Sequence, residues 1–225
     1  MRRIDLNVDL GEGCPNDDAL LALASSANVC AGAHAGSPAR THKTIALAQS
    51  LGVTIGAHPG FPDPGQMGRS PWPLVRLEEA EASLNDQLDS MIGFARYLKP
   101  HGAFYNQSAS EAAWSELLAR LASRGGFPLY GLPGTLHERA AERADVRFVP
   151  EGFAERGYLV DGRLVPRGEA GATIETPQAA ARQAVSLAAR VETICVHGDR
   201  PDSVAVLHAV REAVIEAGYE VRPCV

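Results

Sequence analysis

Short runs of apolar residues recur along the chain and are separated by longer stretches with helical periodicity. The first run spans residues 4–8, where Ile4, Leu6 and Val8 alternate with polar residues, a pattern typical of a strand with one apolar face. Further strands are expected at residues 27–30, 53–57, 97–99, 129–132, 146–149, 193–196 and 219–222. The spacing of these runs predicts a chain that alternates strands with helices.

The stretches between the strands carry signals for the start and end of helices. A Ser-Pro pair at residues 37–38 supplies an N-cap and a first-turn proline, and Gly52 ends the helix that follows. Apolar residues at three- to four-residue spacing across residues 77–98 predict one long amphipathic helix. Two later helices are expected to begin at the Thr-Pro pair of residues 176–177 and at Pro201.

Strands that alternate with helices favour a parallel sheet with right-handed crossovers, which either closes into a barrel or stays open. Polar side chains follow at least six of the expected strands. A barrel brings all of these strand ends to one mouth, whereas an open sheet uses only those at its switch point. We therefore expect residues 1–225 to form a single catalytic (β/α) barrel domain.

One segment interrupts the alternation of strands and helices. Residues 158–167 read YLVDGRLVPR, and their Asp-Gly pair predicts a β-hairpin.

Composition and charge exclude several other classes of protein. The chain has 225 residues, a formal net charge of -6 and no lysine- or arginine-rich run. This argues against nucleic acid and anionic membranes as partners. The N-terminus, MRRIDLNVDLGEG, lacks the apolar run of a signal peptide, and no stretch is apolar enough to span a bilayer. With four scattered cysteines and no CxxC pair, the expected compartment is the cytoplasm.

The polar residues within, at the end of or just after the expected strands are the candidates for chemistry. They are Asp9, Glu12, Asn28, His34, His58, Lys99, His101, Tyr105, Glu151, His197 and Asp199. A single histidine at a strand end is usually structural, but four at equivalent positions, each near glycine, indicate a site that a ligand approaches closely. Three further histidines, His42, His137 and His208, lie within helical stretches and are expected to be structural or on the surface.

Two mechanisms suit this set of residues. In the first, Asp9, His34 and His58 bind a divalent metal, Mg or Zn, that activates water. In the second, Asp9 or Glu12 acts as general base and a histidine protonates a leaving nitrogen. The sequence alone does not separate these mechanisms. Both predict an enzyme that opens an amide-type bond in a small molecule.

Three cations are candidates for holding an anionic substrate. Lys99, in KPHGAFYN, is expected to point into the mouth and neutralise a carboxylate or a developing oxyanion. Arg69, in QMGRS, and Arg156, in FAERGY, are each either an anion clamp or an ordinary surface charge. No G-x-x-x-x-G-K-[ST] sequence is present, so a phosphate-binding P-loop is not expected.

Long motifs along the chain resemble one known family. IDLNVDLGEG, DDALL, SSANV followed by GAHAGSP, GVTIGAHPGFPD, KPHGAFYNQ, FAERGY, DGRLVPR and VHGD are similar to the LamB/YcsF family, from about residue 4 to about residue 218. The resemblance implies a seven-stranded, TIM-like (β/α) barrel of the glycoside hydrolase/deacetylase type. It also implies opening of 5-oxoproline to L-glutamate, driven by ATP and carried out together with two further subunits, B and C, of a 5-oxoprolinase.

The resemblance also assigns residues. The positions that match the family motifs are Asp9, Glu12, Asn28, His34, His58, Lys99, His101, Tyr105, Glu151, Arg156, His197 and Asp199. We expect Asp9, Glu12, His34, His58, Lys99, His101, Glu151 and His197 to be catalytic. The residues expected to bind substrate or nucleotide are Asn28, Arg69, Tyr105, Arg156 and Asp199.

The sequence also departs from the family pattern in four places. CPN follows Gly13 where a longer stretch with tryptophan is usual, Cys30 precedes the position of the family cysteine, Glu155 replaces an aspartate, and a segment before VHGD is missing. These departures leave a different lactam or amide substrate open. Two other functions also stay open: a stand-alone, metal-dependent deacetylase or amidohydrolase, and a non-catalytic subunit. So does assembly into a homo-oligomer.

Overall fold

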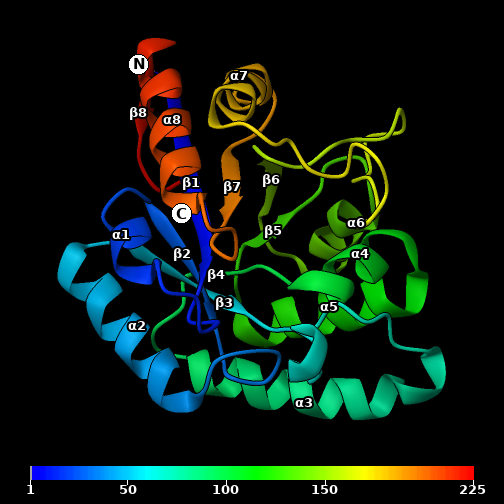
Figure 1. Cartoon of the computed structure of the whole chain (residues 1–225). Coiled ribbons are helices and arrows are strands. Elements are labelled where there is room, and N and C mark those ends of the chain that lie inside the picture. The colour runs from blue at the N-terminus through cyan, green and yellow to red at the C-terminus, as the bar shows by residue number, and fades with distance from the viewer. Residues whose placement is uncertain (1) are drawn as a thin grey trace.

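The computed structural model describes residues 2–225, and its strands form a closed parallel barrel (Figure 1). The seven barrel strands are β1 (Arg2–Leu10), β2 (Ser26–Cys30), β3 (Thr54–His58), β4 (Tyr97–Leu98), β5 (Leu129–Gly131), β6 (Phe148–Phe153) and β7 (Thr193–His197). Each strand pairs in parallel with its neighbour, and β1 closes the ring by pairing with both β2 and β7. An eighth strand, β8 (Tyr219–Val221), pairs with the start of β1 outside the ring. The expected seven-stranded barrel is confirmed.

Helices surround the strands in Figure 1. They are α1 (Asp17–Leu21), α2 (Pro38–Leu51), α3 (Leu77–Met91), α4 (Gly102–Ser110), α5 (Ala112–Gly125), α6 (Leu136–Ala144), α7 (Pro177–Leu187) and α8 (Ser203–Glu216), with 3-10 turns η1 (Pro64–Gln66) and η2 (Leu74–Arg76) after β3. Among residues 2–225, none of these helices combines the length and apolar character needed to cross a bilayer.

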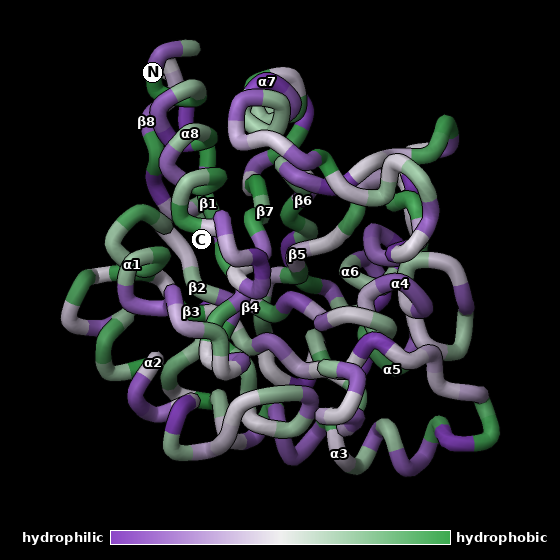
Figure 2. Tube along the Cα trace, in the orientation of Figure 1, coloured by the Kyte–Doolittle hydropathy of each residue, from purple (hydrophilic) through white to green (hydrophobic). Residues whose placement is uncertain are grey.

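The two faces of β1 show how the chain divides its apolar and polar residues. Its apolar side chains join the main hydrophobic core; they are Ile4, Leu6, Val8 and Leu10. The alternate residues Asp5, Asn7 and Asp9 are also buried, but they make hydrogen bonds to side chains of β2, β7 and Lys99 after β4. Figure 2 shows the mixture of apolar and polar residues along the central strands. The apolar core therefore lies between the barrel and the helices, and the polar side chains of β1 point toward the interior of the barrel.

Local signals predicted α2 correctly. The Ser37 hydroxyl accepts the backbone N–H of Arg40, and Gly52 ends the helix with φ 68°. Gly52 permits this left-handed conformation because it has no Cβ. Residues 158–167 form a shorter hairpin than expected, with one antiparallel bridge between Tyr158 and Leu164.

The long helix expected across residues 77–98 is wrong beyond residue 91. Helix α3 ends at Met91, Gly93 takes φ 96°, and Tyr97–Leu98 form β4. Ala95, in the loop after α3, and Leu98, in β4, are both buried and therefore apolar, so they continued the helical spacing of apolar residues. Buried loop and strand residues thus produce the same pattern in the sequence as the apolar face of a helix.

Candidate active site

The carboxyl ends of the barrel strands surround a cavity of about 330 Å³. Its lining includes residues from five of the strand ends: Asp9, His58, Lys99, His101, Phe153 and His197. Parallel strands carry these side chains to one face, where the active sites of (β/α) barrels lie. The structure thus brings together residues from the two ends of the chain, as the barrel predicts.

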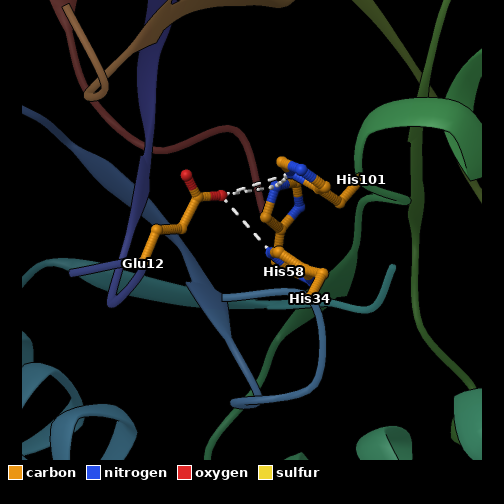
Figure 3. A group of neighbouring side chains, drawn as sticks. All are labelled: Glu12, His34, His58 and His101. Atoms are coloured by element: carbon orange, nitrogen blue, oxygen red, sulfur yellow. Dashed lines mark hydrogen bonds and ion pairs between the residues drawn. The ribbon is translucent and has the colours of Figure 1, made fainter. Parts of the chain in front are cut away.

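One side of this mouth holds three imidazole rings around a carboxylate (Figure 3). Glu12 follows β1, His34 follows β2, His58 ends β3 and His101 follows β4. The Glu12 Oε1 atom lies 3.2 Å from His101 Nδ1, 3.4 Å from His34 Nε2 and 3.9 Å from His58 Nε2. All four residues are buried. We call these four residues the imidazole cluster.

Backbone contacts set the tautomers of two rings in the imidazole cluster. His58 Nδ1 lies 2.9 Å from the Lys99 carbonyl, and His101 Nε2 lies 2.8 Å from the Met67 carbonyl. A carbonyl only accepts, so each of these nitrogens carries a proton. Burial, reinforced by His34 and His58, holds the pKa of His101 well below its usual range, so this ring is neutral. Its lone pair at Nδ1 faces His58 Nε2 at 2.9 Å.

This arrangement fits a metal ion. The imidazole cluster offers three imidazole nitrogens and one carboxylate oxygen, and these four ligand atoms all lie within 4.8 Å of one another. Hydrogen bonds with Cys30 and Glu12 outweigh burial and raise the pKa of His34 to about 9. A proton on His34 therefore balances the Glu12 charge, and a bound metal would replace that proton.

The expected metal set of Asp9, His34 and His58 is thus only partly brought together. His34 and His58 share the imidazole cluster, which also contains Glu12 and His101. Asp9 groups instead with Cys195 and His197, although its Oδ1 lies 3.5 Å from His58 Nε2. The sequence did not indicate this division because all these residues lie at the carboxyl ends of strands or shortly after them.

A buried lysine occupies the centre of the mouth. Lys99 Nζ lies 2.9 Å from Asp9 Oδ1, 3.1 Å from Glu151 Oε1 and 3.2 Å from Asn7 Oδ1. Burial alone would lower the pKa of Lys99, but attraction to the two carboxylates outweighs it and raises that pKa well above its usual value. The ammonium is therefore charged. Conversely, Lys99 and His58 outweigh burial and hold the pKa of Asp9 well below normal.

Two expected site residues lie beneath this lysine rather than against the cavity. Asn28 donates to Asp9 Oδ1 at 2.7 Å and to Asn7 Oδ1 at 2.6 Å, and it accepts from the Tyr97 hydroxyl at 2.6 Å. Glu151 is fully buried and accepts from Asn7. Their contacts indicate that both residues support the ion pairs of Lys99.

The arginines differ in their surroundings. Arg69 pairs with Asp199, with 2.6 Å between Nη2 and Oδ2, and it lines the cavity. Arg156 is buried and donates to the carbonyls of Ala172 at 3.0 Å and Val165 at 2.6 Å. Burial lowers the pKa of Arg156 to about 10. Arg156 therefore anchors the segment after β6 while also lining the cavity.

Several residues at the mouth were not predicted from the sequence, or take a role that it did not indicate. Arg167 lines the cavity, and its only signal was its place in the motif DGRLVPR. Glu155, which departs from the family pattern, contacts His197 through its Oε1 atom. Tyr105 was expected to bind ligand. It is 4 % exposed, and its hydroxyl has no hydrogen-bond partner among residues 2–225. An unpaired buried hydroxyl on a cavity wall is available to a ligand.

The helical histidines follow the expectation. His42 and His208 are exposed, and His137 is a buried structural residue.

Comparison with known proteins identifies the family. The sequence pattern that defines the LamB/YcsF family matches residues 4–225. The chain belongs to the LamB/YcsF family. Among its relatives in this family, the 5-oxoprolinase A subunit of Thermus thermophilus is 39% identical, and the match covers 98% of this chain and 99% of the relative. The 5-oxoprolinase A subunit of Neisseria meningitidis is 37% identical with the same coverage.

Solved structures agree with this assignment. The lactam utilization protein from Thermus thermophilus superposes on this LamB/YcsF chain with a TM-score of 0.84 and 34% identity, over 98% of this chain and 99% of the other. The polysaccharide deacetylase Bc1974 from Bacillus cereus superposes with a TM-score of 0.58 and 15% identity, over 100% and 93% of the two chains. The second similarity shows a shared fold, in line with the expected deacetylase-like barrel.

Proposed function

We propose that this LamB/YcsF chain is the A component of a 5-oxoprolinase, which opens 5-oxoproline to L-glutamate with ATP and together with subunits B and C. In this proposal residues 1–225 form one catalytic domain. The observation that carries it is the near-complete match to proteins named as the A subunits of 5-oxoprolinases. The mouth supports it, because its buried ammonium, carboxylates and imidazoles suit the opening of a small anionic lactam.

The charged groups suggest how the mouth would treat such a substrate. The Lys99 ammonium is preorganised beside Asp9 and Glu151, where it would stabilise negative charge on the lactam oxygen. The low pKa of Asp9 makes it a better charge partner than proton acceptor. The proton for the leaving nitrogen would come from His197, which lines the cavity.

Arginine side chains would bind the anionic parts of the reactants. Arg69, Arg156 and Arg167 line the same cavity as Lys99. We assign the substrate carboxylate to this side, with the Tyr105 hydroxyl as a further donor. Because the chain has no P-loop, part of the ATP site would come from subunits B and C.

We further propose that the imidazole cluster of Glu12, His34, His58 and His101 holds a divalent metal. Three imidazole nitrogens and one carboxylate oxygen favour Zn²⁺ over Mg²⁺, which prefers oxygen ligands. Such an ion would supply Lewis-acid activation of water or of the carbonyl. Titration calorimetry with Zn²⁺ would test this. We expect binding to the wild type and to an exposed control, His42→Ala, and loss of binding in His58→Ala and His101→Ala.

The enzymatic proposal is tested by mixing the purified chain with subunits B and C, 5-oxoproline and ATP. We expect glutamate only when all three proteins and ATP are present, and little from a mixture containing Lys99→Met. Absence of glutamate from the complete mixture would refute the function. Amide hydrolysis by the chain alone, without ATP, would favour a stand-alone amidohydrolase. Full activity of Lys99→Met would favour a non-catalytic role for the chain.

A further inference from the structure

His197 stands at the boundary between two cavities at the mouth of the barrel. It ends β7 and lines both the central cavity of about 330 Å³ and an adjoining cavity of about 370 Å³. Its Nε2 atom lies 3.8 Å from Asp9 Oδ2, on the side where Lys99 is held. The orientation of this ring therefore decides which nitrogen meets a ligand in the central cavity.

Glu155 holds both the ring and the backbone of His197. Its Oε1 atom contacts His197 Nδ1 and also accepts the backbone N–H of His197 at 3.0 Å. A carboxylate only accepts, so the proton on this side of the ring belongs to Nδ1. The neutral ring then has its lone pair at Nε2, and the charged ring has its second N–H there. In both forms Nε2 is the atom that exchanges a proton with the cavity.

The loop that carries Glu155 is fastened on three sides. The N–H of Ala154 donates to the Cys195 carbonyl of β7 at 3.0 Å, and the Glu155 carbonyl accepts from the N–H of Ile174 at 2.9 Å. Gln183 of α7 donates to the Arg156 carbonyl at 2.8 Å. The carboxylate is therefore placed by the barrel, a surface segment and a helix, and little freedom remains for it to swing away from His197.

Charge couples the two residues. Glu155 is 1 % exposed, and within residues 2–225 His197 is the cationic partner at ion-pair distance from its carboxylate. Burial alone would raise the pKa of Glu155, but the His197 charge and hydrogen bonds outweigh it and lower that pKa. The carboxylate thus stays ionised and keeps accepting from Nδ1. The pair is separate from the imidazole cluster, whose ligand atoms come from other residues.

We propose that Glu155 is a positioning residue that fixes the tautomer of His197, so that Nε2 delivers the proton to the leaving nitrogen. The inference rests on the proposed function. In the step concerned, water adds to the carbonyl carbon of the lactam and gives a proton to His197 Nε2. The C–N bond then breaks, its electron pair goes to nitrogen, and the proton on His197 Nε2 forms the new N–H bond. This leaves His197 neutral with Nδ1–H on Glu155.

The first test is spectroscopic and needs no partner protein. Long-range ¹H–¹⁵N spectra of the imidazole nitrogens, with His197→Gln to assign the signals, should show neutral His197 protonated at Nδ1. Glu155→Gln should weaken this preference, because an amide presents both a donor and an acceptor to the ring. Glu155→Asp should keep it, because the carboxylate remains. A neutral His197 protonated at Nε2 in the wild type would overturn the proposal.

The second test is kinetic, in the complete mixture with subunits B and C. Glu155→Gln should lower kcat about 10- to 100-fold, less than the roughly 10²- to 10⁴-fold contribution of acid–base catalysis because His197 itself remains, while KM changes less than about twofold. Glu155→Asp should recover part of the loss. The matched control is Glu175→Gln, an exposed acid on the wall of the adjoining cavity, which should behave as wild type.

The outcomes separate the two proposals. Glu155→Gln with wild-type kcat, or with reduced kcat but an unchanged His197 tautomer, overturns the positioning role. A complete mixture in which the wild type itself releases no glutamate refutes the proposed function, and the spectra then still decide whether Glu155 sets the His197 tautomer.

Discussion

His137 should make the folded chain sensitive to acid. It lies in the first turn of α6, fully buried. Its Nδ1 accepts the Leu132 N–H at 3.0 Å, and its Nε2 lies 2.9 Å from the Ser108 hydroxyl oxygen and 3.1 Å from the Tyr105 carbonyl. Burial lowers the pKa of His137 to about 3. A proton on Nδ1 would also remove the bond from Leu132, so the fold requires the neutral ring.

The loss of stability in acid follows from the difference in the pKa of His137 between the folded and the unfolded chain. An unfolded histidine has a pKa of about 6.5, so below that pH the unfolded chain takes up a proton that the native ring does not accept. The contribution of His137 to stability is therefore intact above about pH 6.5 and falls by about 1.4 kcal/mol per pH unit down to about pH 3. At about pH 5 this amounts to about 2 kcal/mol.

Urea unfolding followed by circular dichroism at about pH 7.5, 6 and 5 would measure this loss of stability. His137→Gln removes the titrating group, so the wild type should lose about 2 kcal/mol more than this variant between the highest and lowest pH. His208→Gln, an exposed histidine on α8, should keep the wild-type pH dependence. Equal pH dependence of the wild type and His137→Gln would show that the native ring accepts the proton, and the reasoning would fail.

Three further substitutions test the packing around the mouth. Lys99→Met leaves two buried carboxylates without their cation and should reduce the free energy of unfolding by about 3–5 kcal/mol in urea titrations. The exposed control Lys43→Met should change the free energy of unfolding by less than about 0.5 kcal/mol. Equal losses of stability in the two variants would contradict the burial argument. Gly56→Ala places a Cβ 2.2 Å from the Tyr97 ring and should lower stability by about 1–3 kcal/mol, so an unchanged melting temperature would exclude the contact. Arg156→Lys cannot keep both carbonyl contacts and should speed proteolysis within residues 157–172; wild-type cleavage rates would show that this anchor is dispensable.

Short-range signals were sufficient for much of the fold. Ser37 and Gly52 mark the ends of α2 because capping involves only neighbouring backbone groups. The strand positions and the closed barrel were also predictable, since polar residues followed at least six strands. The end of α3 was not, because buried loop and strand residues such as Ala95 and Leu98 extend the same apolar spacing.

The sequence by itself determined that acidic, basic and imidazole side chains would meet at one mouth, because parallel strands share a direction. Only the tertiary structure decided how they divide: Glu12 with three imidazoles, Lys99 between two carboxylates, and His197 with Glu155. These partners come from different strands and loops, and their distances depend on how the closed barrel sets the strand ends side by side. No spacing along the chain records that geometry.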